Sequence, residues 1–168
     1  MKKYYFKENF HLFRANGQLY NSKDEEEFTY QSVSTILPEI HVYHWGQEIG
    51  HITTEFRLFL REYGIYSNLG KIDSLKQEFT FFTPKLTLEK TGVTIEGDFF
   101  ALDYELRSRE GKLLAEVDQE IFHMTKQYTV TIYDEPHEDV LILLIIAINE
   151  FDKAADNNAS NIHINSNN

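Results

Sequence analysis

Apolar and polar residues alternate along most of this chain, up to about residue 133. Residues 102–107 and 128–133 each place an apolar side chain at every second position. A period of two is typical of strands that bury one face. The same alternation occurs in residues 27–34, 41–45, 92–96 and 113–118, and turn signals lie at residues 16–17, 45–47, 68–70, 91–92 and 109–111. The pattern therefore predicts many short antiparallel strands.

Three stretches share a degenerate repeat that begins at a glycine. The apolar positions after Gly46 and those after Gly111 keep the same offsets, and Gly70 opens a third copy that is one residue shorter. Each copy is typical of a turn that leads into a long, bent strand. Repeated hairpins favour a closed meander, because closure removes exposed sheet edges.

The pattern changes after residue 133. Residues 140–148 are apolar on every side, and this run is shorter than the roughly 20 residues that a helix needs to cross a bilayer. The preceding residues 134–139 are typical of a helix start, with an acidic cap at Asp134, an early proline at Pro136 and further carboxylates. A buried strand is the alternative, since Val and Ile favour strands. The cap and the polar ending favour a helix from about Pro136 to about Ala155.

A helix that is apolar all round must be enclosed all round, and a flat sheet covers only one side. The sequence therefore predicts a mainly β fold, a closed antiparallel β-barrel wrapped around one hydrophobic C-terminal α-helix. A chain of 168 residues fits one domain, which we expect over residues 1–156. Residues 157–168 are rich in Asn and Ser and predict a disordered polar tail.

Charge and composition exclude several classes of function. The formal net charge is −11, which repels nucleic-acid phosphates and anionic headgroups on average, so we expect no nucleic-acid partner. There is no cysteine, which excludes disulfides, thiol catalysis and cysteine-based zinc sites. The apolar start of the chain is broken at Lys7 and Glu8, too early for a secretory signal. These features predict a cytoplasmic protein without a transmembrane segment, and they leave its oligomeric state open.

Several segments resemble the bacterial LURP-one-related family. They are residues 61–66, 82–88, 97–106, 111–117 and 127–130 together with the apolar helix, and the resemblance covers roughly residues 4–156. It implies a twelve-stranded barrel around a hydrophobic C-terminal helix, similar to the C-terminal domain of tubby proteins and to phospholipid scramblases. Two features depart from the pattern. The first turn, residues 23–26, lacks the usual glycine, and the helix proposed as a membrane anchor in scramblases is here better explained as core.

The histidines are the residues that most suggest a metal site. His41, His44, Glu48 and His51 lie close in sequence, and on a helix the last three would share a face that could hold zinc. The neighbouring glycines and the alternation predict strands instead, in which the three histidines need not converge. We therefore assign no metal ligand and no cofactor. The acidic run 24–27 lacks the alternating spacing of a calcium loop and predicts a solvated turn.

The serines lack a nucleophile-elbow setting, and no phosphate-binding glycine loop is present. The first hypothesis is thus a non-catalytic binding or interaction module with an unknown protein or lipid partner. The second, suggested by the resemblance, is a protein that binds phospholipid or phosphoinositide at the membrane periphery, or a scramblase-like one. Its candidate headgroup contacts are Arg57, Arg61, Lys85 and Lys90. The third is a hydrolase that uses a metal held by the histidines.

Overall fold

The computed structural model describes residues 1–6, 16–33, 37, 39–57, 60–76, 85–98, 103–122 and 125–150. These residues form twelve strands, a 3-10 turn η1 (Glu135–His137) and a helix over residues 138–150, here called the central helix. The strands are β1 (Lys2–Phe6), β2 (Asn16–Asn21), β3 (Glu26–Ser32), β4 (Glu39–His44), β5 (Gln47–Arg57), β6 (Leu60–Ser67), β7 (Gly70–Lys76), β8 (Lys85–Thr87), β9 (Thr94–Asp98), β10 (Asp103–Arg107), β11 (Leu113–Phe122) and β12 (Thr125–Ile132). The predicted strands are therefore confirmed, and the repeats that follow Gly46 and Gly111 form the long strands β5 and β11.

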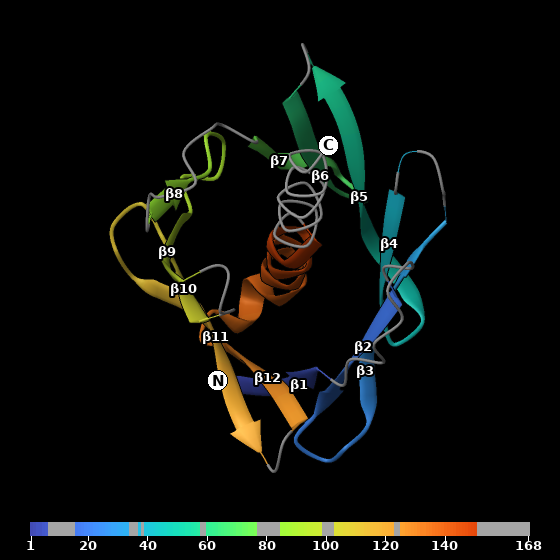
Figure 1. Ribbon diagram of the computed structural model, residues 1–168, viewed down its shortest axis with the longest axis vertical. Helices are drawn as coiled ribbons and strands as arrows, with labels where there is room; N and C mark the ends of the chain where they lie inside the picture. Colours follow the sequence, from blue (N-terminus) through green and yellow to red (C-terminus); the bar gives the residue numbers. More distant parts are fainter. Residues whose placement is uncertain are drawn as a thin grey trace, which may run out of the picture.

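All twelve described strands belong to one antiparallel sheet in the order β7-β6-β5-β4-β3-β2-β1-β12-β11-β10-β9-β8. Strands that follow one another in the chain pair as neighbours, with the exception of β7 and β8. In addition β1 pairs with β12, so that Lys2 lies opposite Ile132 and Phe6 opposite Tyr128. Figure 1 shows how this sheet curls around the central helix.

The central helix fills the inside of the sheet (Figure 1). Every residue from 141 to 149 is buried, and most of the strands contribute inward side chains that are fully buried, among them Leu19, Phe28, Val42, Ile65, Leu106 and Val130. This arrangement confirms that the apolar run is an enclosed helix and not a thirteenth strand. The predicted continuation to Ala155 and the predicted tail 157–168 lie outside the described residues.

The start of the helix differs from the prediction in one respect. Pro136 does lie in the first turn, but this turn is η1, and Asp134 before it makes no capping hydrogen bond with its side chain. The Asp134 carboxylate instead accepts hydrogen bonds from His137 Nδ1 at 2.8 Å and Lys112 Nζ at 3.3 Å. The predicted carboxylate cap is therefore wrong, because two cationic or polar side chains engage the same oxygens.

The prediction of a closed barrel is also wrong, because the hydrogen-bonded ladder of the described strands does not close on itself. β7 and β8 are the two edges of the sheet, and no strand pairing joins them within the described residues. β8 is three residues long, and in the part of the chain that the structure describes it pairs only with β9. A side chain bridges the gap instead of a ladder.

That side chain is Asp73 on β7, which is almost completely buried. Its Oδ2 atom accepts hydrogen bonds from the backbone N–H of Lys90 at 3.1 Å, the backbone N–H of Thr91 at 2.8 Å and the Thr91 hydroxyl at 2.9 Å. Its Oδ1 atom accepts one from the backbone N–H of Ser74 at 2.8 Å. We call the contact of Asp73 with Lys90 and Thr91 the seam. It links the two sheet edges without strand pairing.

The turn that lacks the family's usual glycine still forms a hairpin between β2 and β3. Asn21 Oδ1 accepts hydrogen bonds from the backbone N–H groups of Lys23 at 2.9 Å and Glu25 at 3.1 Å. Asp24 adopts a φ of 63°, a left-handed conformation that Asp and Asn tolerate better than most residues. Asn21 and Asp24 together thus replace the glycine.

Candidate functional site

A buried group of polar side chains lies where the chain enters the central helix. Its core consists of Tyr4 on β1, Glu27 on β3, His44 at the end of β4, and Glu138, the first residue of the central helix; we call these four residues the entry cluster. Tyr4, Glu27 and Glu138 are buried, and His44 is partly buried. Strand alternation explains why two of these four side chains point toward the interior. Tyr4 lies on the inner face of β1 together with Phe6, and His44 follows Ile40 and Val42 on the inner face of β4.

Glu27 reaches the interior through a β-bulge. Leu19 lies opposite Phe28, but Tyr20 lies opposite Glu26, so Glu27 is the extra residue on β3. A bulge changes the direction of a side chain and is common next to functional sites. As a result Glu27 and its neighbour Phe28 are both buried, which strict alternation would forbid.

One phenol connects the two buried carboxylates. The Tyr4 hydroxyl lies 2.9 Å from Glu27 Oε1 and also contacts Glu138 Oε1. A phenol carries one hydrogen, so it donates to one of these oxygens at a time. Burial, with the two carboxylates beside the hydroxyl, raises the pKa of Tyr4 far above its ordinary value, and the phenol therefore stays neutral.

Lys2 supplies one positive charge from the outer rim. Its Nζ atom lies 2.6 Å from Glu138 Oε2 and 3.7 Å from Glu27 Oε1. The hydrogen bond to Glu138 raises the pKa of Lys2 in spite of its partial burial. Because 41% of the Lys2 side chain is exposed, the ammonium sits at the boundary between the cluster and solvent.

Within the entry cluster, Glu27 contacts more side chains than Glu138 does. Burial by itself would raise its pKa, but hydrogen bonds from Asn21 and Tyr4, the contact with His44 and the charge of Lys2 together lower the pKa of Glu27 below its ordinary value. The Asn21 bond, from Nδ2 to Glu27 Oε2, is 3.0 Å long. Glu27 is therefore a buried carboxylate that remains ionised.

Both ring nitrogens of His44 face carboxylate oxygens. Nε2 lies 3.3 Å from Glu27 Oε1, and Nδ1 lies 2.8 Å from Asp139 Oδ1 on the central helix. The ring stacks on Phe28 with 4.1 Å between ring centroids, which holds its orientation. Within the described residues, Glu27, His44 and Glu138 form a group of metal-ligating type, with one ligand atom from each lying within 4.8 Å of the others.

The other two histidines lie elsewhere. His41 and His51 are paired across β4 and β5, and their rings stack with 5.7 Å between centroids. His41 Nδ1 lies 2.9 Å from Glu48 Oε1. The three histidines therefore do not converge, as strand alternation predicts. Sequence reasoning missed the grouping of His44 with Glu27 and Glu138, because these residues are far apart in the chain and no spacing connects them.

The predicted headgroup contacts fall on two separate hairpins. Arg57 at the end of β5 lies opposite Leu60, next to Arg61 on β6. Lys85 begins β8, and Lys90 in the following turn lies at the seam, with its Nζ 3.4 Å from the backbone oxygen of Lys71. The side chains of Arg57, Arg61 and Lys85 lie outside the described residues. Arg57 and Arg61 thus lie one residue out of register on neighbouring strands, whereas Lys85 and Lys90 lie on β8 and in the turn that follows it.

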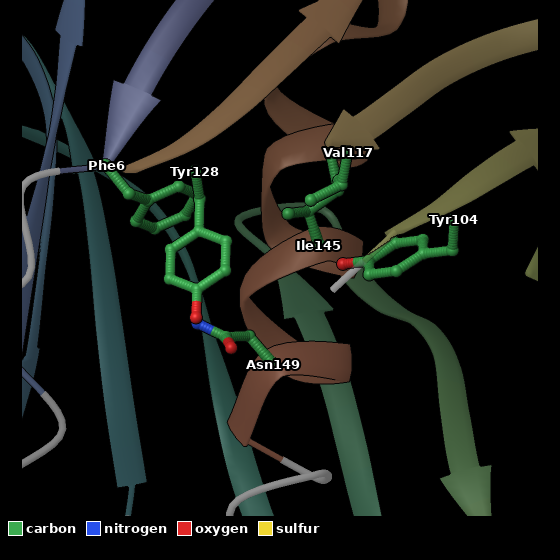
Figure 2. Close-up of a pocket in the computed structure, with 6 residues that line it drawn as sticks. All are labelled: Phe6, Tyr104, Val117, Tyr128, Ile145 and Asn149. Atoms are coloured by element: carbon green, nitrogen blue, oxygen red, sulfur yellow. The ribbon is translucent and has the colours of Figure 1, made fainter. Parts of the chain in front are cut away.

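The interior holds a small cavity beside the central helix, shown in Figure 2. It is lined by Phe6, Tyr104, Val117, Tyr128, Ile145 and Asn149, and its volume is about 10 Å³. The Tyr128 hydroxyl points toward the Asn149 amide (Figure 2). A volume of this size accommodates about one water molecule, whereas sites for small organic ligands are typically about 300–1,000 Å³. This cavity is therefore not a ligand site.

Two large apolar side chains are exposed at neighbouring hairpin tips. Trp45, between β4 and β5, is 60% exposed, and Leu69, between β6 and β7, is 100% exposed. β5 and β6 pair directly, and Asn68 Nδ2 donates a 2.8 Å hydrogen bond to the backbone oxygen of Glu48, which ties the two tips together. We call Trp45 and Leu69 the tip pair. The Trp45 indole also lies nearly parallel to the His44 ring, 6.4 Å away, so the tip pair adjoins the entry cluster.

A comparison with protein families decides the relationship of this chain. Residues 1–149 match the model of the family described as LURP-one-related. The chain belongs to the LURP-one-related family. No curated protein and no solved structure matches the chain. The matched region contains all twelve described strands and nearly all of the central helix, so the residues of the entry cluster and of the tip pair lie inside the region that matches the LURP-one-related family.

The LURP-one-related chain has no membrane-spanning helix among its described residues, since none is both long enough and apolar enough. The central helix is instead accounted for by burial within the sheet.

The hydroxyl of Tyr4 provides a direct test of the entry cluster. We expect Tyr4→Phe to lower the free energy of unfolding by about 1–3 kcal/mol, because two buried carboxylates lose the hydroxyl that they share. Urea denaturation measures this loss. Tyr5→Phe is the matched control, since Tyr5 lies on the other face of β1. Equal stability of the two variants would show that the hydroxyl adds nothing to the fold.

Proposed function

We propose that this LURP-one-related protein is a non-catalytic binding module whose partner contacts its outer surface at the tip pair. The observation that carries the proposal is the filled interior. Its own helix occupies the inside of the sheet, and the described cavity beside that helix has room for about one water molecule. A substrate of ordinary size does not fit in this cavity, which favours recognition at the surface.

The tip pair supports the choice of surface. Large exposed apolar side chains are costly in water, and tryptophan is among the residues that contribute most to binding at protein interfaces. Trp45 and Leu69 lie on hairpins that a hydrogen bond between Asn68 and Glu48 holds together. A preformed pair of this kind loses little conformational entropy on binding.

Charge defines the chemistry of the partner. The protein carries a formal net charge of −11, and the carboxylates of Glu135 and Asp139 are partly exposed at the same end of the sheet, next to the start of the central helix. Complementary charge steers association and disfavours wrong partners. We therefore expect a protein partner that offers an apolar pocket with a basic rim.

Cross-linking in the host cell tests this proposal. We expect the parent protein to enrich a partner that Trp45→Ala binds roughly ten- to thirtyfold more weakly, which corresponds to about 1.4–2 kcal/mol. Val33→Ala is the matched control, because Val33 is 57% exposed but lies at the connection between β3 and β4, the opposite end of the sheet. Thermal unfolding should be unchanged in both variants, since both side chains are exposed.

Two results would contradict the proposal. One is a partner that binds the parent and Trp45→Ala equally well. The other is co-sedimentation with phosphatidylserine or phosphoinositide vesicles at physiological salt, which the net charge of −11 opposes. Loss of that co-sedimentation on changing Arg57 and Arg61 to Glu would favour the second candidate, peripheral lipid binding through the hairpin of β5 and β6.

A further inference from the structure

We propose that the entry cluster binds one divalent transition-metal ion of the zinc type, with Glu27, His44 and Glu138 as its ligands. The three residues come from β3, β4 and the central helix, so the ion would join the helix to two strands. This inference is independent of the partner proposed above.

The first argument concerns the ring of His44. If its Nδ1–H donates to Asp139, at 2.8 Å, then Nε2 presents a lone pair to Glu27 Oε1, only 3.3 Å away. A lone pair and a carboxylate oxygen repel each other unless a positive charge lies between them. A proton or a metal ion can supply that charge. Ligating histidines commonly donate their second nitrogen to a carboxylate, which is the relation that Asp139 has to His44.

The second argument concerns charge. The carboxylates of Glu27, Glu138 and Asp139 surround His44 and Tyr4, whereas Lys2 supplies the one ammonium among these contacts. The Tyr4 hydroxyl has a single hydrogen for two carboxylates. A divalent ion would neutralise the two buried carboxylates, and burial of carboxylates without such compensation is costly.

The third argument is geometric. Zinc binds nitrogen and oxygen at about 2.0–2.2 Å, so two of its tetrahedral ligands lie about 3.3–3.6 Å apart. The separation of 3.3 Å between His44 Nε2 and Glu27 Oε1 fits this value, and the Glu138 oxygen lies within 4.8 Å of both. One nitrogen with two carboxylates suits zinc and its neighbours better than calcium, which prefers six to eight oxygens.

Lys2 is the competitor for this position. Its ammonium now contacts both carboxylates, but 41% of its side chain is exposed, so it can turn into solvent when an ion enters. Removal of the ammonium should therefore strengthen metal binding, an effect that a purely structural role of the cluster would not produce.

Calorimetric titration of the full chain with Zn²⁺, after treatment with a chelator, tests the proposal. We expect one ion per chain, binding at least tenfold weaker in His44→Gln and Glu138→Gln, and binding about tenfold tighter in Lys2→Met. His51→Gln is the matched control and should bind like the parent, because His51 stacks on His41 and Tyr66 outside the cluster. Ca²⁺ titrated in parallel should bind much more weakly than Zn²⁺.

Circular dichroism identifies any variant that fails to fold. Lys2→Met keeps the test decisive in that case, because the expected result is tighter Zn²⁺ binding, which a misfolded protein would not give. The proposal is overturned if neither the parent nor Lys2→Met binds Zn²⁺ at one ion per chain. It is equally overturned if His51→Gln abolishes binding while His44→Gln retains it, which would assign the ion to the pair of His41 and His51.

Discussion

Leu144→Asp is expected to abolish cooperative unfolding and leave an insoluble or molten chain. Leu144 lies in the central helix, is fully buried, and is enclosed on all sides by the sheet. A carboxylate placed there finds neither water nor a partner, which costs at least several kcal/mol. The total stability of a domain is about 5–15 kcal/mol, so this single change removes much or all of it. Thermal unfolding followed by circular dichroism measures the effect.

Leu69→Asp provides the matched control, since it makes the same chemical change at a fully exposed hairpin tip. This variant should unfold within a degree or two of the parent temperature, because the new carboxylate is solvated. Ile145→Lys should behave like Leu144→Asp, since Ile145 is also buried in the central helix. A cooperative transition of Leu144→Asp near the parent temperature would mean that the helix is not enclosed.

Asp73→Ala is expected to lower the free energy of unfolding by about 2–5 kcal/mol and to open the seam. The change removes the acceptor for the backbone N–H groups of Lys90 and Thr91 and for the Thr91 hydroxyl, and donors that lose a buried acceptor are expensive. No ladder joins β7 to β8 in the described residues, so no strand pairing compensates for the loss. Urea denaturation gives the change in the free energy of unfolding.

Amide hydrogen exchange shows which part of the fold is destabilised. The amides of Lys90 and Thr91 should exchange much faster in Asp73→Ala than in the parent protein. The amides of β3 and β4, in the middle of the sheet, should exchange faster only to the extent that the whole fold is less stable. Asp103→Ala is the control, because Asp103 is exposed on β10. Unchanged exchange at the two seam amides would show that the sheet edges are held together by other contacts.

The strands and the enclosed helix could be predicted because the burial of each element determines which of its own positions are apolar. A strand with one buried face alternates with a period of two, and a helix that is surrounded shows no polar side at all. These signals are strong in residues 113–118, 128–133 and 140–148, and each of these segments has the predicted structure. The family relationship was recognisable for the same reason, since its motifs follow the strands and turns.

The details that decide chemistry depend on pairing between distant segments. Glu27 turns inward because a bulge shifts the register between β2 and β3, and the residue pattern of β3 alone does not reveal which strand it will oppose. The Asp134 side chain does not cap the helix, and its Oδ1 atom instead accepts a hydrogen bond from Lys112, in the hairpin before β11. Both effects come from neighbours that local periodicity does not specify.

The sequence by itself determined a mainly β protein around a buried helix, since each element's hydrophobic period depends only on its own residues. Only the tertiary structure decided that, among the described strands, no ladder joins β7 to β8 and Asp73 contacts the turn after β8 instead. It also decided that Tyr4, Glu27, His44 and Glu138 meet at one point. The physical reason is that hydrogen bonds and ion pairs form between atoms a few ångströms apart, and the folded path of the whole chain sets which atoms those are.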